Sequence, residues 1–133
     1  MPHWRYHFFI ATAFVCGQLS LPAANGAATA HSALITTPRD ISSALKSCWQ
    51  PPAGSEGLSA TARFSFKRDG NLMGPPQITF SRLGNDDARS RAFLQSIADA
   101  FLACTPLSFS ASFGQSVAGR IFTLRFIPAL QRA

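Results

Sequence analysis

Few residues of this 133-residue chain could do chemistry, and their positions argue against most enzyme mechanisms. The three histidines, His3, His7 and His31, all fall within the first 31 residues. The rest of the chain therefore lacks the base that Ser–His–Asp and Cys–His mechanisms need. Its one adjacent carboxylate pair, Asp86 and Asp87, opens a helical pattern, where acidic side chains favour the helix dipole more readily than they act as an acid–base pair. We expect no catalytic residue and no enzyme activity.

The cysteines and glycines give no sign of a metal or cofactor. Cys16, Cys48 and Cys104 stand far apart with no histidine beside them, so the ligand spacing of a zinc site is absent. The glycines form neither a dinucleotide-binding nor a phosphate-loop motif. We therefore expect no bound metal and no cofactor.

The first thirty residues predict a secretory signal peptide. Arg5 precedes an apolar run that begins at Phe8 and fades by Leu21, and small residues follow up to Ala30. Cleavage after residue 24, 28 or 30, each an alanine, fits this pattern, so we expect the folded domain at residues 31–133. One alternative is a retained membrane anchor, but a spanning helix needs about 20 apolar residues and this run is shorter. Another is a lipid on Cys16, but Phe14 and Val15 directly before it are not the small side chains that such sites favour.

Removal of the signal leaves Cys48 and Cys104 in a chain that enters an oxidising compartment. With two cysteines only one intramolecular disulfide exists, and closing a loop of this length would stabilise the fold by about 4 kcal/mol. The alternative is a pair of buried free thiols. We expect the disulfide, and no stable membrane span after cleavage.

Each of these cysteines ends a helical pattern. Thr37-Pro38 is a typical helix start, and apolar residues then recur at helical spacing up to Cys48, before two prolines at 51–52. A second amphipathic pattern begins at residues 85–87 and runs to Cys104, where Thr105-Pro106 ends it. The sequence therefore predicts two helices.

A β-hairpin is predicted between the two helices. Residues 58–68 alternate strictly between apolar and polar, and Asp69-Gly70 follows as a strong hairpin turn signal. The chain should return antiparallel from residue 72, break at the prolines of residues 74–76, and resume its alternation with Ile78 and Phe80. Residues 107–119 are predicted to form a loop, and residues 119–126 a last strand. The order α-β-β-α-β gives a small α+β domain.

The large aromatic side chains of this pattern are expected in the core. Phe64 and Phe66 would otherwise suggest a base-stacking platform for RNA, but they share a strand face with small and apolar residues. Trp49 is expected to pack beside the disulfide, with ligand stacking as the alternative. The basic residues are scattered without a run of five like charges, so we expect no nucleic-acid partner.

The ordered motifs CWQPP at 48–52, RDG at 68–70, GPP at 74–76, ACTP at 103–106 and FIP at 126–128 resemble the carboxy-terminal domain of TolA and TonB proteins, over residues 38–128. The resemblance implies a periplasmic domain with a three-stranded antiparallel sheet and two helices packed on one face. It also implies a non-catalytic module that binds an envelope protein or peptide segment by strand addition at the sheet edge. The edge strand carried over is Arg120, Ile121, Phe122, Thr123, Leu124, Arg125 and Phe126.

Two features qualify this expectation. TolA and TonB proteins have an anchor and a long spacer before the domain, whereas here fewer than ten residues separate the predicted signal from the first helix, so we expect a stand-alone module. Beyond the leader, the chain has eleven basic residues and six acidic ones. This net positive charge favours binding to acidic proteins, anionic lipid or envelope polymers. The alternative function is therefore an envelope enzyme or enzyme inhibitor that acts on an anionic polymer through its basic surface.

Overall fold

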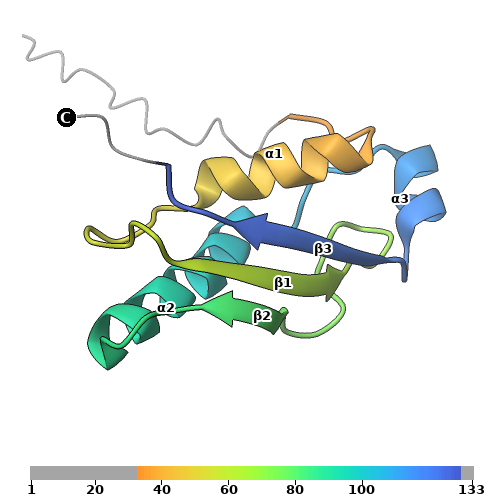
Figure 1. Cartoon of the computed structure of the whole chain (residues 1–133). Coiled ribbons are helices and arrows are strands. Elements are labelled where there is room, and N and C mark those ends of the chain that lie inside the picture. Colours follow the sequence, from red (N-terminus) through yellow and green to blue (C-terminus); the bar gives the residue numbers. More distant parts are fainter. Residues whose placement is uncertain (1–32, 130–133) are drawn as a thin grey trace, which may run out of the picture.

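A computed structural model describes residues 33–129 of the chain (Figure 1), so the predicted signal peptide lies outside the described residues. The elements are α1 (Pro38–Cys48), β1 (Ser59–Ser65), β2 (Gln77–Arg82), α2 (Asp87–Cys104), α3 (Ala111–Val117) and β3 (Ile121–Phe126). The predicted α+β class and the order α-β-β-α-β are confirmed, with one added short helix, α3. None of the helices between residues 33 and 129 has the length and apolar character that crossing a membrane requires.

The three strands form one antiparallel sheet in the order β2-β1-β3. β1 is therefore the central strand, and β2 and β3 are the two edges. Figure 1 shows the sheet from its uncovered face, with α2 behind it and α1 running along the β3 side. The expected arrangement of a three-stranded sheet covered by helices on one face is confirmed.

The core lies between the helices and the apolar face of β1. Ala60 and Ala62 are fully buried at the centre of the sheet, and their small side chains leave room for the large rings of Phe93 and Phe101 from α2. Ile41 of α1 joins the same cluster. Burial of a large apolar side chain stabilises a fold by about 1.5–3 kcal/mol, so this cluster is the main source of stability.

Phe64 and Phe66 belong to this core, as predicted. Phe64 is 6% exposed and Phe66 is fully buried, and their rings pack edge to face with centroids 5.6 Å apart. Neither ring is available to stack on a nucleic-acid base, so the core interpretation is confirmed.

The first turn of α1 is closed by reciprocal hydrogen bonds. The Thr37 hydroxyl accepts from the Asp40 amide at 3.3 Å, and the Asp40 carboxylate accepts from the Thr37 amide at 2.9 Å. The carboxylate also accepts from the Thr36 amide at 3.2 Å. Hydrogen bonds from Thr37 first, and then from Thr36, hold the pKa of Asp40 below its ordinary value. This capping box satisfies amides that the helix itself cannot pair.

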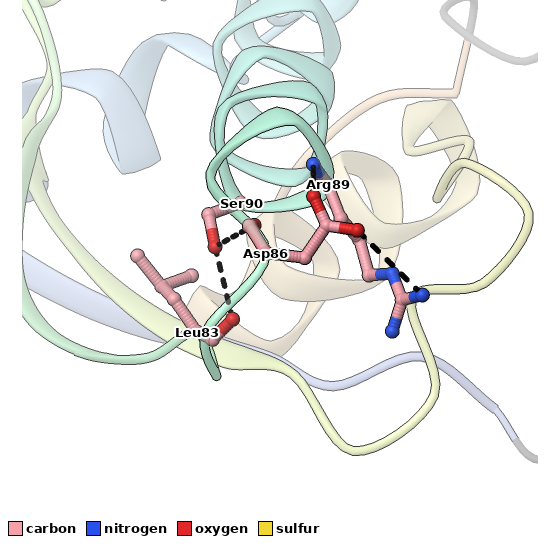
Figure 2. Close-up of polar contacts among 4 residues, drawn as sticks. All are labelled: Leu83, Asp86, Arg89 and Ser90. Carbon is pink, nitrogen blue, oxygen red and sulfur yellow. Dashed lines mark hydrogen bonds and ion pairs between the residues drawn. The ribbon is translucent and has the colours of Figure 1, made fainter.

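The connection from β2 to α2 is tied to the first turn of α2 (Figure 2). Asp86 caps the helix, with its carboxylate accepting from the Arg89 amide at 3.0 Å. The Ser90 hydroxyl donates to the Leu83 carbonyl at 2.9 Å and to the Asp86 carbonyl at 2.8 Å. The Arg89–Asp86 ion pair, at 3.9 Å and half exposed, adds little. Hydrogen bonds of the cap therefore set where α2 begins.

The hairpin turn depends on Gly70. Its φ is 84°, and the Asp69 carboxylate accepts from the Asn71 amide, which lowers the pKa of Asp69. The Gly70 carbonyl accepts from the Leu107 amide at 3.0 Å. A Cβ at Gly70 would lie 1.8 Å from the Leu107 carbonyl oxygen, so only glycine fits both the turn and this close approach.

The prediction of a loop over residues 107–119 is wrong at its centre, because Ala111–Val117 form α3. The Ser110 hydroxyl caps this helix by accepting from the Phe113 amide at 3.3 Å. Phe113 and Val117, four residues apart, are buried and hold the helix on the core. One such pair among serines and a glycine is too short a pattern to signal a helix.

The alternation predicted for Ile78 and Phe80 is also wrong, because a bulge separates them. Ile78 pairs with Ala62 and Phe80 pairs with Thr61, which leaves Thr79 as an extra residue in β2. Cross-strand partners point to the same face, so Ile78 lies on the helix side and Phe80 on the uncovered side of the sheet. Phe80 is 58% exposed.

Candidate functional site

The residues predicted to bind a partner lie at one edge of the sheet. Residues 121–126 form β3, which pairs only with β1 within the described part of the chain, and Arg120 directly precedes it. Phe122, Leu124 and Phe126 point to the core, whereas Ile121, Thr123 and Arg125 are exposed. Strand geometry alone therefore divides the predicted set into residues that hold the edge in place and residues that face solvent.

Successive residues of β1 direct their backbone amides and carbonyls alternately towards β2 and towards β3. Two hydrogen bonds at the end of the strand show which residues face which neighbour. The Ser65 carbonyl accepts from the Met73 amide on the β2 side, at 2.9 Å. The Phe66 carbonyl accepts from the Gly119 amide on the β3 side, at 3.0 Å. Because the direction reverses at each residue, the even-numbered residues of β1 bond to β3 and the odd-numbered ones to β2.

The same phase fixes which groups of β3 are free. Its even-numbered residues pair with the even-numbered residues of β1, at Phe64↔Phe122, Ala62↔Leu124 and Ala60↔Phe126, and turn their amides and carbonyls inward. The amides and carbonyls of the odd-numbered residues of β3 point away from the sheet. These are Ile121, Thr123 and Arg125.

The outward groups of β3 have no partner among residues 33–129, since no hydrogen bond there reaches them. They form a row of three donors and three acceptors along one line. Such a row is a template for pairing with another extended chain. We call it the β3 edge.

A hollow of about 320 Å³ lies at the carboxyl end of the β3 edge. It is lined by the end of α1 and by the end of β3 with the residues after it: Lys46, Trp49, Pro51, Arg125, Ile127 and Ala129. Two of these residues are basic and none is acidic, and most of the others are apolar. The hollow therefore suits an apolar side chain with a negative charge close by.

Trp49 is the rigid wall of this hollow. Its ring packs edge to face on Phe93 and Phe126, with centroids 5.9 and 5.1 Å away. Its indole nitrogen donates to the Ser96 hydroxyl on α2 at 2.9 Å. Trp49 thus packs on the core as predicted, and the part of its surface that stays accessible lines the hollow.

The predicted disulfide between Cys48 and Cys104 is present, with Cα atoms 6.0 Å apart. It joins the last residue of α1 to the last residue of α2. Because Trp49 directly follows Cys48, the bond also holds the wall of the hollow against α2. The alternative of two free thiols is wrong.

β2 is the other edge of the sheet, and all six of its residues are exposed. By the same phase, Ser81 points its amide away from β1, since its partner Ala60 bonds to β3. The prolines at 75 and 76 shorten this edge, because proline donates no hydrogen bond. The hollow beside the β3 edge has no lining residue from this strand.

Metal-ligating side chains are not gathered in the part of the chain that the structure describes. No group of three or more His, Cys, Asp or Glu lies together there. The β3 edge and its hollow remain the feature best suited to recognition. The sequence signalled the strand, but it did not signal the hollow.

Comparison with known families places the chain. A family model described as Uncharacterised conserved protein UCP034077 matches residues 31–129. The chain belongs to this family. Neither the curated proteins nor the solved structures gave a match. The β3 edge, the hollow and the disulfide all fall within the part that matches the UCP034077 family.

Proposed function

We propose that this protein is a non-catalytic, stand-alone binding module of the periplasm that captures an extended segment of an envelope protein along the β3 edge. The observation that carries the proposal is the row of outward amides and carbonyls at Ile121, Thr123 and Arg125. Strand addition pairs these groups and extends the sheet by one strand.

The energetics assign different tasks to the edge and to the hollow. Three outward residues offer six hydrogen bonds, each worth about 0.5–1.5 kcal/mol net, or about 3–9 kcal/mol together. Association costs about 4–15 kcal/mol, so backbone pairing alone gives weak binding at best. An apolar side chain buried in the hollow adds about 1.5–3 kcal/mol. Backbone pairing therefore supplies the larger part of the favourable free energy, and the hollow adds to it and sets the sequence preference.

The lining of the hollow defines the segment that suits it. Trp49, Pro51 and Ile127 favour an apolar side chain, and Lys46 and Arg125 favour a carboxylate next to it. We therefore expect the captured segment to be extended, with an apolar residue beside Asp or Glu where it passes the carboxyl end of β3.

Two further observations support this role. The motif order resembles the carboxy-terminal domain of TolA and TonB proteins, whose members bind segments at the last strand of the sheet. The Cys48–Cys104 disulfide is compatible with an oxidising compartment. Both agree with the leader-like first thirty residues.

The test compares two proline variants at the two edges. Thr123→Pro removes one outward amide of β3, and Ser81→Pro removes one outward amide of β2; neither amide bonds to β1. Both variants are first checked for native circular dichroism and thermal unfolding. Each is then used to recover partners from an envelope extract. We expect Thr123→Pro to lose partners that Ser81→Pro and the wild type retain.

Two results would contradict the proposal. Equal recovery by all three proteins would remove strand addition as the mode of binding. Loss with Ser81→Pro alone would move the site to β2.

A further inference from the structure

The face of the sheet that the helices leave uncovered carries an unusual set of charges. The register places Arg63 of β1, Arg82 of β2 and Arg125 of β3 on this face, one arginine from each strand. No acidic residue lies on it. All six acidic residues of the chain fall in helices or in connections between elements.

Two of these arginines lie over the same point of β1. Ser59 is directly paired with Arg82, and its hydroxyl accepts from Arg125 Nη2 at 3.4 Å. Ser59 is only 4% exposed although it points to the uncovered face, and the Arg125 side chain lies against its hydroxyl. The side chains of Arg82 and Arg125 therefore both start beside Ser59, with no carboxylate on the face to neutralise them.

Apolar side chains stand among these cations. The bulge in β2 turns Phe80 onto this face, and Ile121 joins it from β3; each is 58% exposed. A hollow of about 310 Å³ opens beside Ile121, and Arg63 is the one charged residue of its lining. Met73, at its rim, is 53% exposed.

We propose that this uncovered face docks on an anionic lipid surface. The guanidinium groups of Arg63, Arg82 and Arg125 bind headgroup phosphates, for which their paired donors are well suited. Phe80 and Ile121 reach the boundary between headgroups and acyl chains. A soluble polyanion would use the arginines but would leave these two exposed apolar side chains without a role.

This docking does not depend on strand capture. A face lying on a membrane leaves the edges of the sheet free, because backbone groups at an edge point within the plane of the sheet. The module could then hold a partner segment at the β3 edge while it sits on the lipid. The two proposals share Arg125, which also lines the hollow, but vesicle binding is measured without a partner segment, so each can succeed or fail alone.

The test measures sedimentation of the protein with vesicles of phosphatidylcholine alone, and with vesicles that also contain phosphatidylglycerol. Each basic residue near an anionic surface contributes about fivefold to partitioning. The triple variant Arg63→Gln, Arg82→Gln and Arg125→Gln should therefore bind the anionic vesicles about 100-fold more weakly at low salt. Binding of the wild type should also fall as salt rises.

A matched control removes the same charge elsewhere. Arg39→Gln, Arg89→Gln and Arg91→Gln change three exposed arginines of α1 and α2. All variants keep the same first 32 residues, so any contribution of that segment is equal in every sample. The control should bind anionic vesicles only a few-fold more weakly than the wild type, because its loss reflects only the lower net charge of the protein.

The outcomes decide the proposal. Equal loss by the two triple variants, or binding to phosphatidylcholine that equals binding to anionic vesicles, would overturn it. Phe80→Ser, which keeps every charge, should weaken vesicle binding several-fold and leave binding to dextran sulfate unchanged. Phe80→Ser could instead leave both vesicle binding and dextran sulfate binding unchanged. If the triple variant of Arg63, Arg82 and Arg125 then loses dextran sulfate binding as strongly as vesicle binding, the ligand is a soluble polyanion and the lipid proposal is wrong.

Discussion

Removal of the Cys48–Cys104 disulfide should destabilise the fold by about 4 kcal/mol. The two cysteines are 56 residues apart. In the chain-entropy model, opening a loop of that length returns about 14 cal/mol/K to the unfolded chain, or about 4 kcal/mol at room temperature. Small domains have about 5–15 kcal/mol of total stability, so this one bond supplies a large share.

The assay is urea unfolding of the Cys48→Ala/Cys104→Ala variant beside the wild type with and without reductant. The double substitution and the reduction perturb the protein differently. Cys104 is 1% exposed, so its truncation to alanine also removes packed atoms. Reduction keeps both sulfur atoms and reports the cross-link itself. We expect the reduced wild type to lose about 4 kcal/mol and the double variant to lose the same or slightly more.

The refuting result is a loss below about 1 kcal/mol in both experiments. The unfolded chain would then hold its two helix ends together without the bond, and the role given to the disulfide would be wrong. A large loss in the double variant alone would assign the effect to packing around Cys104.

Three further predictions concern local features of the fold. Gly70→Ala should cost at least about 2 kcal/mol more than Gly74→Ala in urea unfolding, because both glycines have a φ of 84° but only Gly70 approaches the Leu107 carbonyl; equal losses would contradict this. Thr37→Ala should cost about 1 kcal/mol through the lost cap, and no change would show that the cap is dispensable. The pKa of Asp40 is lower in the folded protein than in the unfolded chain, so its stabilisation is present at neutral pH and is lost as pH falls through the folded value. Asp40→Asn should therefore narrow the gap between stabilities measured at pH 7 and pH 3, whereas an unchanged gap would contradict this assignment.

The parts of the fold that the sequence predicted well are those with strong local patterns. Strict alternation followed by Asp69-Gly70 indicated the hairpin, since side-chain period and turn chemistry agreed. The pairing of Cys48 with Cys104 was predictable because only one intramolecular pair remained once the leader was set aside. These signals are local or combinatorial, so they need no knowledge of packing.

The parts of the fold that the sequence did not predict depend on contacts between distant residues. The side of the sheet that Phe80 faces is decided by an extra residue at Thr79, and the pairing partner that reveals it is nearly twenty residues away. α3 is held by burial of Phe113 and Val117 against the core, and its own propensity is weak. In each case tertiary packing overrode the local pattern.

The candidate site was predicted in part. The sequence indicated β3 as a strand, and resemblance to a known family suggested it as the edge. The outward phase of Thr123, and the hollow between Lys46 and Ile127, follow from the pairing register and from how α1 meets β3. Such features combine residues about eighty positions apart, which no local pattern contains.

The most direct test of the central claim is residue-resolved amide hydrogen exchange in β3. In the protein alone, the amides of Ile121, Thr123 and Arg125 should exchange rapidly, and those of Phe122 and Leu124 should be protected by their bonds to β1. A peptide identified from partners recovered with the wild type should then protect the three outward amides. Strong protection of these amides without the peptide, or no gain with it, would contradict strand capture at the β3 edge.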